Sequence, residues 1–177
     1  SRLPIAAGRV WRASLCGMSG GMSVDQTVAF IGAGNMAGAL IRGLIRTGTV
    51  PADRITAADP DRARLDALRS ELGVRTGEDN AEALRSANVV VLATKPQVFP
   101  SVLPALGASL RPDALVVSIA AGISTKIIEG SLPAGARVVR TMPNTPAGVG
   151  GGPTAIAGGK HATDADRATV ETLSQSV

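Results

Sequence analysis

The sequence predicts an α/β domain in which helices cover both faces of a doubly wound, mainly parallel sheet. Short apolar runs alternate with segments of helical periodicity, two of the later runs are apolar without interruption, and helix-length stretches separate successive runs. An uninterrupted apolar run is typical of a strand buried on both faces, and helix-length connections join parallel strands. One domain is expected, because a chain of 177 residues has the size of an ordinary domain.

In the first half of the chain, strands and helices alternate. The first helix has apolar residues at helical spacing and ends at Gly48, and the second ends before Gly73. We expect Asp59 to cap the second helix, with Pro60 at its first position. The strands of this half are expected at residues 28–31, 55–58 and 74–75.

The second half continues the alternation. A short helix at about residues 79–87 precedes the apolar run at 89–93, and helical sequence at about 97–106 leads to the next such run at 115–119. Ser124 is suited to cap the helix that follows. The remaining expected elements are a sixth strand, a further strand and a last helix, at residues 137–140, 154–157 and 164–176.

Residues 1–21 differ from the rest of the chain in composition. They contain arginine and serine and no acidic residue, which is also the pattern of an organellar transit peptide. Met22, however, has the character of a natural start immediately before the first strand. We interpret residues 1–21 as a non-native or disordered leader, and we assign residues 22–177 to the domain.

Composition and charge argue against several classes of function. Residues 1–24 hold three of the four excess positive charges, so the rest of the chain lacks the basic footprint of a nucleic-acid or membrane-surface binder. A single cysteine, Cys16, and a single histidine, His161, argue against disulfide frameworks, Cys-rich zinc sites and histidine triads. The single cysteine fits a reducing, cytosol-like compartment. Because no run approaches the length of a membrane helix, we expect no membrane partner.

The motif that carries chemistry follows the first strand directly. Residues 32–37 read Gly-Ala-Gly-Asn-Met-Ala, the G-x-G-x-x-A pattern of a Rossmann-type dinucleotide-binding loop. The first glycine permits a tight turn, the second lets the backbone approach a pyrophosphate, and the alanine allows close packing of helix on strand. The N-terminus of the following helix supplies N–H groups to the anion. We expect cofactor binding by Gly32, Ala33, Gly34, Asn35, Met36 and Ala37.

The acidic residue that follows the second strand leaves the cofactor open between NAD and NADP. Asp59 lies 27 residues after Gly32, which is more than the usual spacing of about 20. Its carboxylate is suited to the ribose hydroxyls of NAD. Arg62 and Arg64, on the following turns, are suited to the 2′-phosphate of NADP.

Three segments follow strands at the edge of the sheet where open α/β domains bind ligands. They are residues 93–96, 120–122 and 141–146. Lys95 in the first of them is suited to hydrogen-bond a cofactor ribose, although a solvated loop lysine explains it equally well. The small residues of the second segment would let a nicotinamide ring come close.

Four motifs occur in the order and at the separations found in one enzyme family. They read FIGAGNMA at residues 30–37, VVLATKPQ at 90–97, VVSIAAGI at 116–123 and MPNTPA at 142–147. In these motifs the chain resembles the pyrroline-5-carboxylate reductases, and the resemblance covers residues 27–177. Hydroxyacid dehydrogenases and deazaflavin-dependent NADP reductases share the glycine loop but fit the last motif less well.

The resemblance implies the last step of proline biosynthesis, in the cytoplasm. A hydride would pass from NADPH, with NADH as the other option, to the imine carbon of 1-pyrroline-5-carboxylate, and the product would be L-proline. The resemblance places the pyrophosphate on residues 32–37, and it implies no metal. Asn80 is equally well explained by a helix cap. Contacts to ribose and nicotinamide are implied for Asn80, Ala93, Thr94, Lys95, Pro96 and Ala121.

The family pattern extends beyond the residues of this chain. Family members continue into a helical domain that builds the dimers of a homo-oligomer and contributes an S-G-S-G-P-A type loop near the imine, and nothing in this chain matches that domain. We therefore assign no catalytic residue, and we predict that the 177-residue chain binds nicotinamide nucleotide but reduces the imine poorly. The alternative is a truncated, non-catalytic module that binds or senses the nucleotide.

Overall fold

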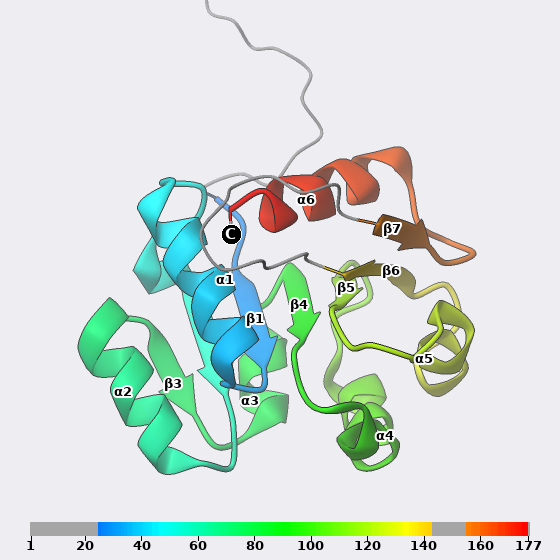
Figure 1. The fold of residues 1–177 in the computed structure, drawn as a ribbon. Helices are drawn as coiled ribbons and strands as arrows, with labels where there is room; N and C mark the ends of the chain where they lie inside the picture. The colour runs from blue at the N-terminus through cyan, green and yellow to red at the C-terminus, as the bar shows by residue number, and fades with distance from the viewer. Residues whose placement is uncertain (1–24, 143–154, 177) are drawn as a thin grey trace, which may run out of the picture.

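A seven-stranded sheet runs through the centre of the molecule in the order β3-β2-β1-β4-β5-β6-β7 (Figure 1). The computed structural model describes residues 25–142 and 155–176. Neighbouring strands from β3 to β6 pair in parallel, and β7 pairs antiparallel with β6, so the prediction of a mainly parallel sheet is confirmed. The strands are β1 (Val28–Ile31), β2 (Ile55–Ala58), β3 (Arg75–Gly77), β4 (Val89–Leu92), β5 (Leu115–Ser118), β6 (Arg137–Met142) and β7 (Ala155–Gly158).

Helices cover both faces of the sheet, as the sequence predicts, and each face has its own apolar core. The helices α1 (Asn35–Arg46), α2 (Arg62–Leu72) and α6 (Asp164–Ser174) contribute to one core. The helices α3 (Asn80–Arg85), α4 (Phe99–Ser109) and α5 (Thr125–Ser131) contribute to the other. Short 3-10 turns, η1 (Ala52–Arg54) and η2 (Pro96–Val98), precede β2 and α4.

The chain reverses its direction of winding between β3 and β4. The first three strands step outward from β1 to β3, and β4 then returns to pair with the other side of β1. In Figure 1, β1 runs downward and α1 returns upward in front of it. The carboxyl ends of β1 and β4 therefore lie side by side at the switch point, which is where open α/β sheets bind their ligands.

The expectation that Asp59 caps the second helix is wrong. The cap is Asp61, whose Oδ1 accepts hydrogen bonds from the backbone N–H groups of Ala63 and Arg64, and α2 begins at Arg62. Asp59 is not free to cap this helix, because its own carboxylate accepts the backbone N–H groups of Ala33 and Asp61. The segment after β2 is therefore two residues longer than the sequence pattern indicates.

Other boundaries shift by a few residues. The third strand is formed by Arg75–Gly77 and not by residues 74–75, because it pairs with Thr56–Ala58 beyond the apolar part of its sequence. The helix expected from residue 97 begins at Phe99, after the 3-10 turn. Residue 154 and the leader lie outside the described residues, so the interpretation of residues 1–21 stays a prediction. Within the described part of the chain, no helix is long and apolar enough to span a membrane.

Candidate functional site

A cleft of about 450 Å³ opens at the carboxyl ends of β1, β2, β4 and β5. Four segments that are distant in the sequence form it: the loops that follow these four strands. It coincides with the switch point of the sheet. The residues that line it are Gly32, Gly34, Asn35, Met36, Asp59, Pro60, Arg64, Ala93, Thr94, Lys95, Pro96, Val98, Ile119, Ala120 and Ala121.

The two glycines of the β1–α1 loop have different physical roles. Gly32 has a left-handed backbone with φ of +104°, and a Cβ placed there would lie 2.8 Å from the carbonyl carbon and oxygen of Ala93. Gly34 has an ordinary extended backbone, and a Cβ placed there would meet no atom within 4 Å. The fold therefore requires Gly32, whereas Gly34 leaves open space at the surface of the cleft.

Helix α1 begins at this open space without a side-chain cap. Gly34 is its N-cap residue, and its first turn holds no acidic residue. By contrast, Asp61 and Asp79 cap the N-termini of α2 and α3. The first N–H groups of a helix have no partner within the helix, and together with the helix dipole they attract an anion. The start of α1 is therefore suited to a ligand's pyrophosphate.

Asp59 lies between the glycine loop and the start of α2. It is 7% exposed, and both of its carboxylate oxygens accept hydrogen bonds from the backbone. Oδ2 accepts the N–H of Ala33 at 2.7 Å, and Oδ1 accepts the N–H of Asp61 at 2.8 Å. The carboxylate therefore joins the glycine loop to the end of β2, while one side of the residue still lines the cleft.

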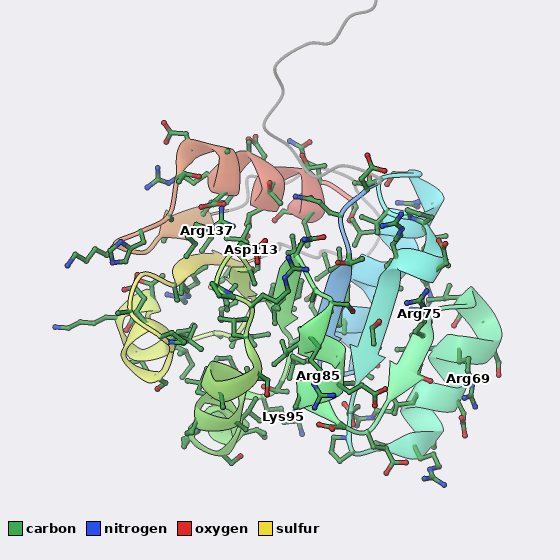
Figure 2. The ribbon with its side chains drawn as sticks, turned by 180° about the vertical axis from the view of Figure 1, so that it is seen from behind. Arg69, Arg75, Arg85, Lys95, Asp113 and Arg137 are labelled. Atoms are coloured by element: carbon green, nitrogen blue, oxygen red, sulfur yellow. The ribbon has the colours of Figure 1, made fainter. Side chains whose placement is uncertain are left out.

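The other end of the cleft has a small and largely apolar wall. Ala93 and Thr94 follow β4, and Ala120 and Ala121 follow β5. Lys95 is exposed and adds a positive charge at the rim; in Figure 2 it lies beside α4. A flat ring can approach the backbone over such small residues, and a lysine at the rim is suited to ribose hydroxyl or phosphate oxygens.

Ten of the thirteen predicted site residues line the cleft. The other three are Ala33, which is buried within the glycine loop, Ala37, which is fully buried in α1, and Asn80, which begins α3 outside the lining. Ala120 belongs to the segment 120–122 that the sequence placed at the nicotinamide, whereas three other lining residues, Pro60, Val98 and Ile119, were not predicted as site residues. These residues directly adjoin the predicted segments in the sequence, and this proximity could have identified them as lining residues. In the last motif, residues 143–147 lie outside the described residues.

The cleft fits a nicotinamide dinucleotide in three respects. It has an uncapped helix N-terminus with open space over Gly34 for the pyrophosphate. It has small residues at the end of β5 for a flat ring. It also has arginine and lysine side chains, Arg64 and Lys95, for anionic or hydroxyl groups.

Comparisons with known proteins agree with this geometry. The model of the family described as "NADP oxidoreductase coenzyme F420-dependent" matches residues 27–122. The pyrroline-5-carboxylate reductase of Methanosarcina acetivorans is 42% identical over 151 residues, which cover 85% of this chain and 56% of that protein. The chain thus spans little more than half the length of this curated relative.

Solved structures give the same result for the fold. The pyrroline-5-carboxylate reductase of Coxiella burnetii superposes with a TM-score of 0.79 at 34% identity, covering 86% of this chain and 56% of that chain. A Plasmodium falciparum pyrroline carboxylate reductase, solved with NADP bound, superposes with a TM-score of 0.75 at 24% identity. That alignment covers 87% of this chain and 56% of the Plasmodium chain.

Proposed function

This chain belongs to the family described as coenzyme F420-dependent NADP oxidoreductases, and from that premise we propose that it binds NADPH and serves the reduction of 1-pyrroline-5-carboxylate to L-proline. The observation that carries the proposal is the uncapped start of α1 with open space over Gly34. The 42% identity to a pyrroline-5-carboxylate reductase supports the choice of substrate.

Different loops of the cleft contact different parts of the cofactor. The N–H groups at the start of α1 receive the pyrophosphate, and Gly34 lets it approach the backbone. The loops after β4 and β5 form the nicotinamide end, where Ala121 offers no side chain beyond Cβ to hold the ring away. Thr94 and Lys95 are placed to contact the ribose between these two regions.

The NADPH that these residues would hold would supply a hydride to the imine carbon and leave as NADP⁺, and with a proton taken up from solvent the imine would become the secondary amine of L-proline. The chain's own residues orient the cofactor, and the apolar side chains of Met36, Ile119 and Ala120, which also line the cleft, exclude water from it. We further propose a cytoplasmic enzyme that works as a homo-oligomer built on dimers, which the resemblance to the reductases implies.

Substitution of Gly34 tests cofactor binding. Gly34→Ala should fold normally, because the backbone there is extended and the new methyl group meets no atom of the protein. The methyl group would stand where the pyrophosphate approaches the loop, so we expect the affinity for NADPH to fall by about tenfold or more. Calorimetric titration measures the affinity, and a thermal melt reports folding.

Gly130→Ala is the matched control for this substitution. A Cβ at Gly130 also meets nothing within 4 Å, but the residue lies in α5, away from the cleft lining. This variant should bind NADPH like the parent chain. Equal affinities in the Gly34 and Gly130 variants would contradict the placement of the cofactor.

A turnover assay separates the reductase from a binding module. NADPH consumption is followed with and without 1-pyrroline-5-carboxylate, beside the binding titration. Consumption that requires the imine supports the reductase, and we expect it to be slow in the 177-residue chain. Binding with no imine-dependent consumption supports the nucleotide-binding module instead.

A further inference from the structure

Two arginines at the start of α2 lie in different environments. The side chain of Arg64 lines the cleft, together with Asp59 and Pro60. Arg62, two residues earlier, lies in a separate groove along β3, and its Nε donates to Glu78 at 2.7 Å. Only one of the two arginines considered for a 2′-phosphate therefore faces the proposed cofactor site.

Arg64 is held at the rim of the cleft by the residue that caps its own helix. Its Nε lies 3.2 Å from Oδ2 of Asp61, while the other oxygen of Asp61 accepts the first N–H groups of α2. Within residues 25–142 and 155–176, Asp61 is the only carboxylate that pairs with Arg64. The side chain is 53% exposed, so the rest of the guanidinium is accessible to a ligand.

Asp59, the other candidate for reading the ribose, is already engaged. Its two oxygens accept the N–H groups of Ala33 and Asp61, and the residue is 7% exposed. These bonds join the glycine loop to the end of β2. In NAD-specific enzymes of this fold, the carboxylate at this position accepts hydrogen bonds from the ribose hydroxyls. The carboxylate of Asp59 accepts backbone N–H groups instead.

We propose that Arg64 determines the preference for NADPH over NADH by pairing with the 2′-phosphate, and that Asp59 is a positioning residue for the glycine loop. This inference rests on the proposed function. A guanidinium presents several N–H donors in a planar fork that matches phosphate oxygens, and a phosphate carries the charge that NADH lacks. The contact is therefore absent from NADH and adds affinity for NADPH alone.

The test compares the affinities for NADPH and NADH in Arg64→Gln and in Arg62→Gln, which is the matched control. Loss of a charge-assisted contact should lower the affinity of Arg64→Gln for NADPH by about tenfold. Its affinity for NADH should change far less. Arg62→Gln should keep the NADPH to NADH ratio of the parent chain, because Arg62 lies in the other groove.

Two further probes isolate the phosphate. Adenosine 2′,5′-bisphosphate carries the 2′-phosphate, 5′-AMP does not, and both lack the nicotinamide. Arg64→Gln should therefore lower the affinity for the bisphosphate and leave the affinity for 5′-AMP unchanged. Arg64→Lys keeps the charge and should restore part of the NADPH affinity. A parallel loss of NADPH and NADH affinity in Arg64→Gln would overturn the inference.

Asp59→Asn tests the second part. An amide cannot accept the N–H groups of both Ala33 and Asp61, because one of its two ends is itself a donor. The glycine loop should loosen, and the affinities for NADPH and NADH should fall by similar factors. A selective loss of NADH affinity would instead make Asp59 the ribose reader.

The failures of the inference and of the proposed function are distinguishable. A parent chain that binds neither nucleotide contradicts the proposed function. A parent chain that binds both nucleotides equally well supports the cleft as a dinucleotide site and overturns the role of Arg64. If Asp59→Asn does not fold, this supports the role of Asp59 in positioning the glycine loop. The Arg64 variants then still test the preference for NADPH over NADH, because the side chain of Arg64 is half exposed and its substitution should not affect folding.

Discussion

Gly32 and Gly48 share a left-handed backbone but differ in what surrounds them. Their φ angles are +104° and +68°. A Cβ at Gly32 would lie 2.8 Å from the backbone of Ala93, whereas a Cβ at Gly48 would meet nothing within 4 Å. The two positions therefore separate the cost of backbone strain from the cost of a steric clash.

We predict that Gly48→Ala destabilises the fold by about 1–2 kcal/mol, which is the cost of a left-handed backbone in an L-residue. Gly32→Ala should cost about 3 kcal/mol or more, because the loop must also move away from the strand end at Ala93. Urea unfolding measures both free energies. Similar costs for the two variants would contradict the close approach of the loop to β4.

At the scale of single residues, chemical type was predictable and hydrogen-bond partners were not. The position of Asp59 after a strand identifies it as a site residue. Its two backbone partners come from a loop 26 residues away and from its own turn, which no local pattern specifies. Likewise, Arg62 and Arg64 are two positions apart on a helix and so face different sides of it, but only the packing of α2 decides which of them faces the cleft.

At the scale of elements, the second half of α1 is in close contact with the turn that follows α6. A Cβ at Gly43 would overlap the carbonyl oxygen of Ser176, and Arg46 donates to the same oxygen at 3.4 Å. Ser176 itself is 2% exposed. The absence of a side chain at Gly43 therefore allows the turn that follows α6 to pack against the helix that begins at the glycine loop.

We predict that Gly43→Ala destabilises the protein by about 1–3 kcal/mol, because overpacking there displaces backbone. Gly38→Ala on the same helix is the control. Its Cβ would meet chiefly the flexible end of Arg42 at 3.1 Å, so better helix propensity should make it neutral or stabilising. Thermal unfolding gives the ranking, and hydrogen exchange should show the loss of protection concentrated in α6. Equal effects of the two substitutions would contradict this packing.

The elements themselves were largely predictable because their burial is extreme. Every residue of β1, β4 and β5 is buried, and all of them except Ser118 are apolar, so these strands stand out in the sequence as apolar runs. The start of α2 was misplaced because Asp59 and Asp61 are both acceptable caps by type. The choice between them depends on a hydrogen bond to Ala33, which belongs to another element.

At the scale of the molecule, sequence periodicity predicts a parallel sheet but not the order of its strands. β1 lies between β2 and β4 because β4 pairs with the free edge of β1 after the chain has passed β3. That pairing joins residues about 60 positions apart, and a local pattern carries no such information. The glycine loop nevertheless indicated the position of the site without the strand order, because dinucleotides bind at the carboxyl end of the first strand in sheets of this type.

The same long-range assembly gives a prediction for the whole molecule. The cleft combines loops after β1, β2, β4 and β5, so the unfolded chain has no site to offer. NADPH should therefore raise the free energy of unfolding with its concentration, by about 2.7 kcal/mol at a hundredfold excess over its dissociation constant. Thermal melts over a series of NADPH concentrations measure the rise. Gly34→Ala, with an affinity at least tenfold lower, should lose about half of this rise or more, and Gly130→Ala should keep it, because Gly34 lines the cleft and Gly130 does not. A melting temperature that does not respond to NADPH in the parent chain would contradict a site built by the folded sheet.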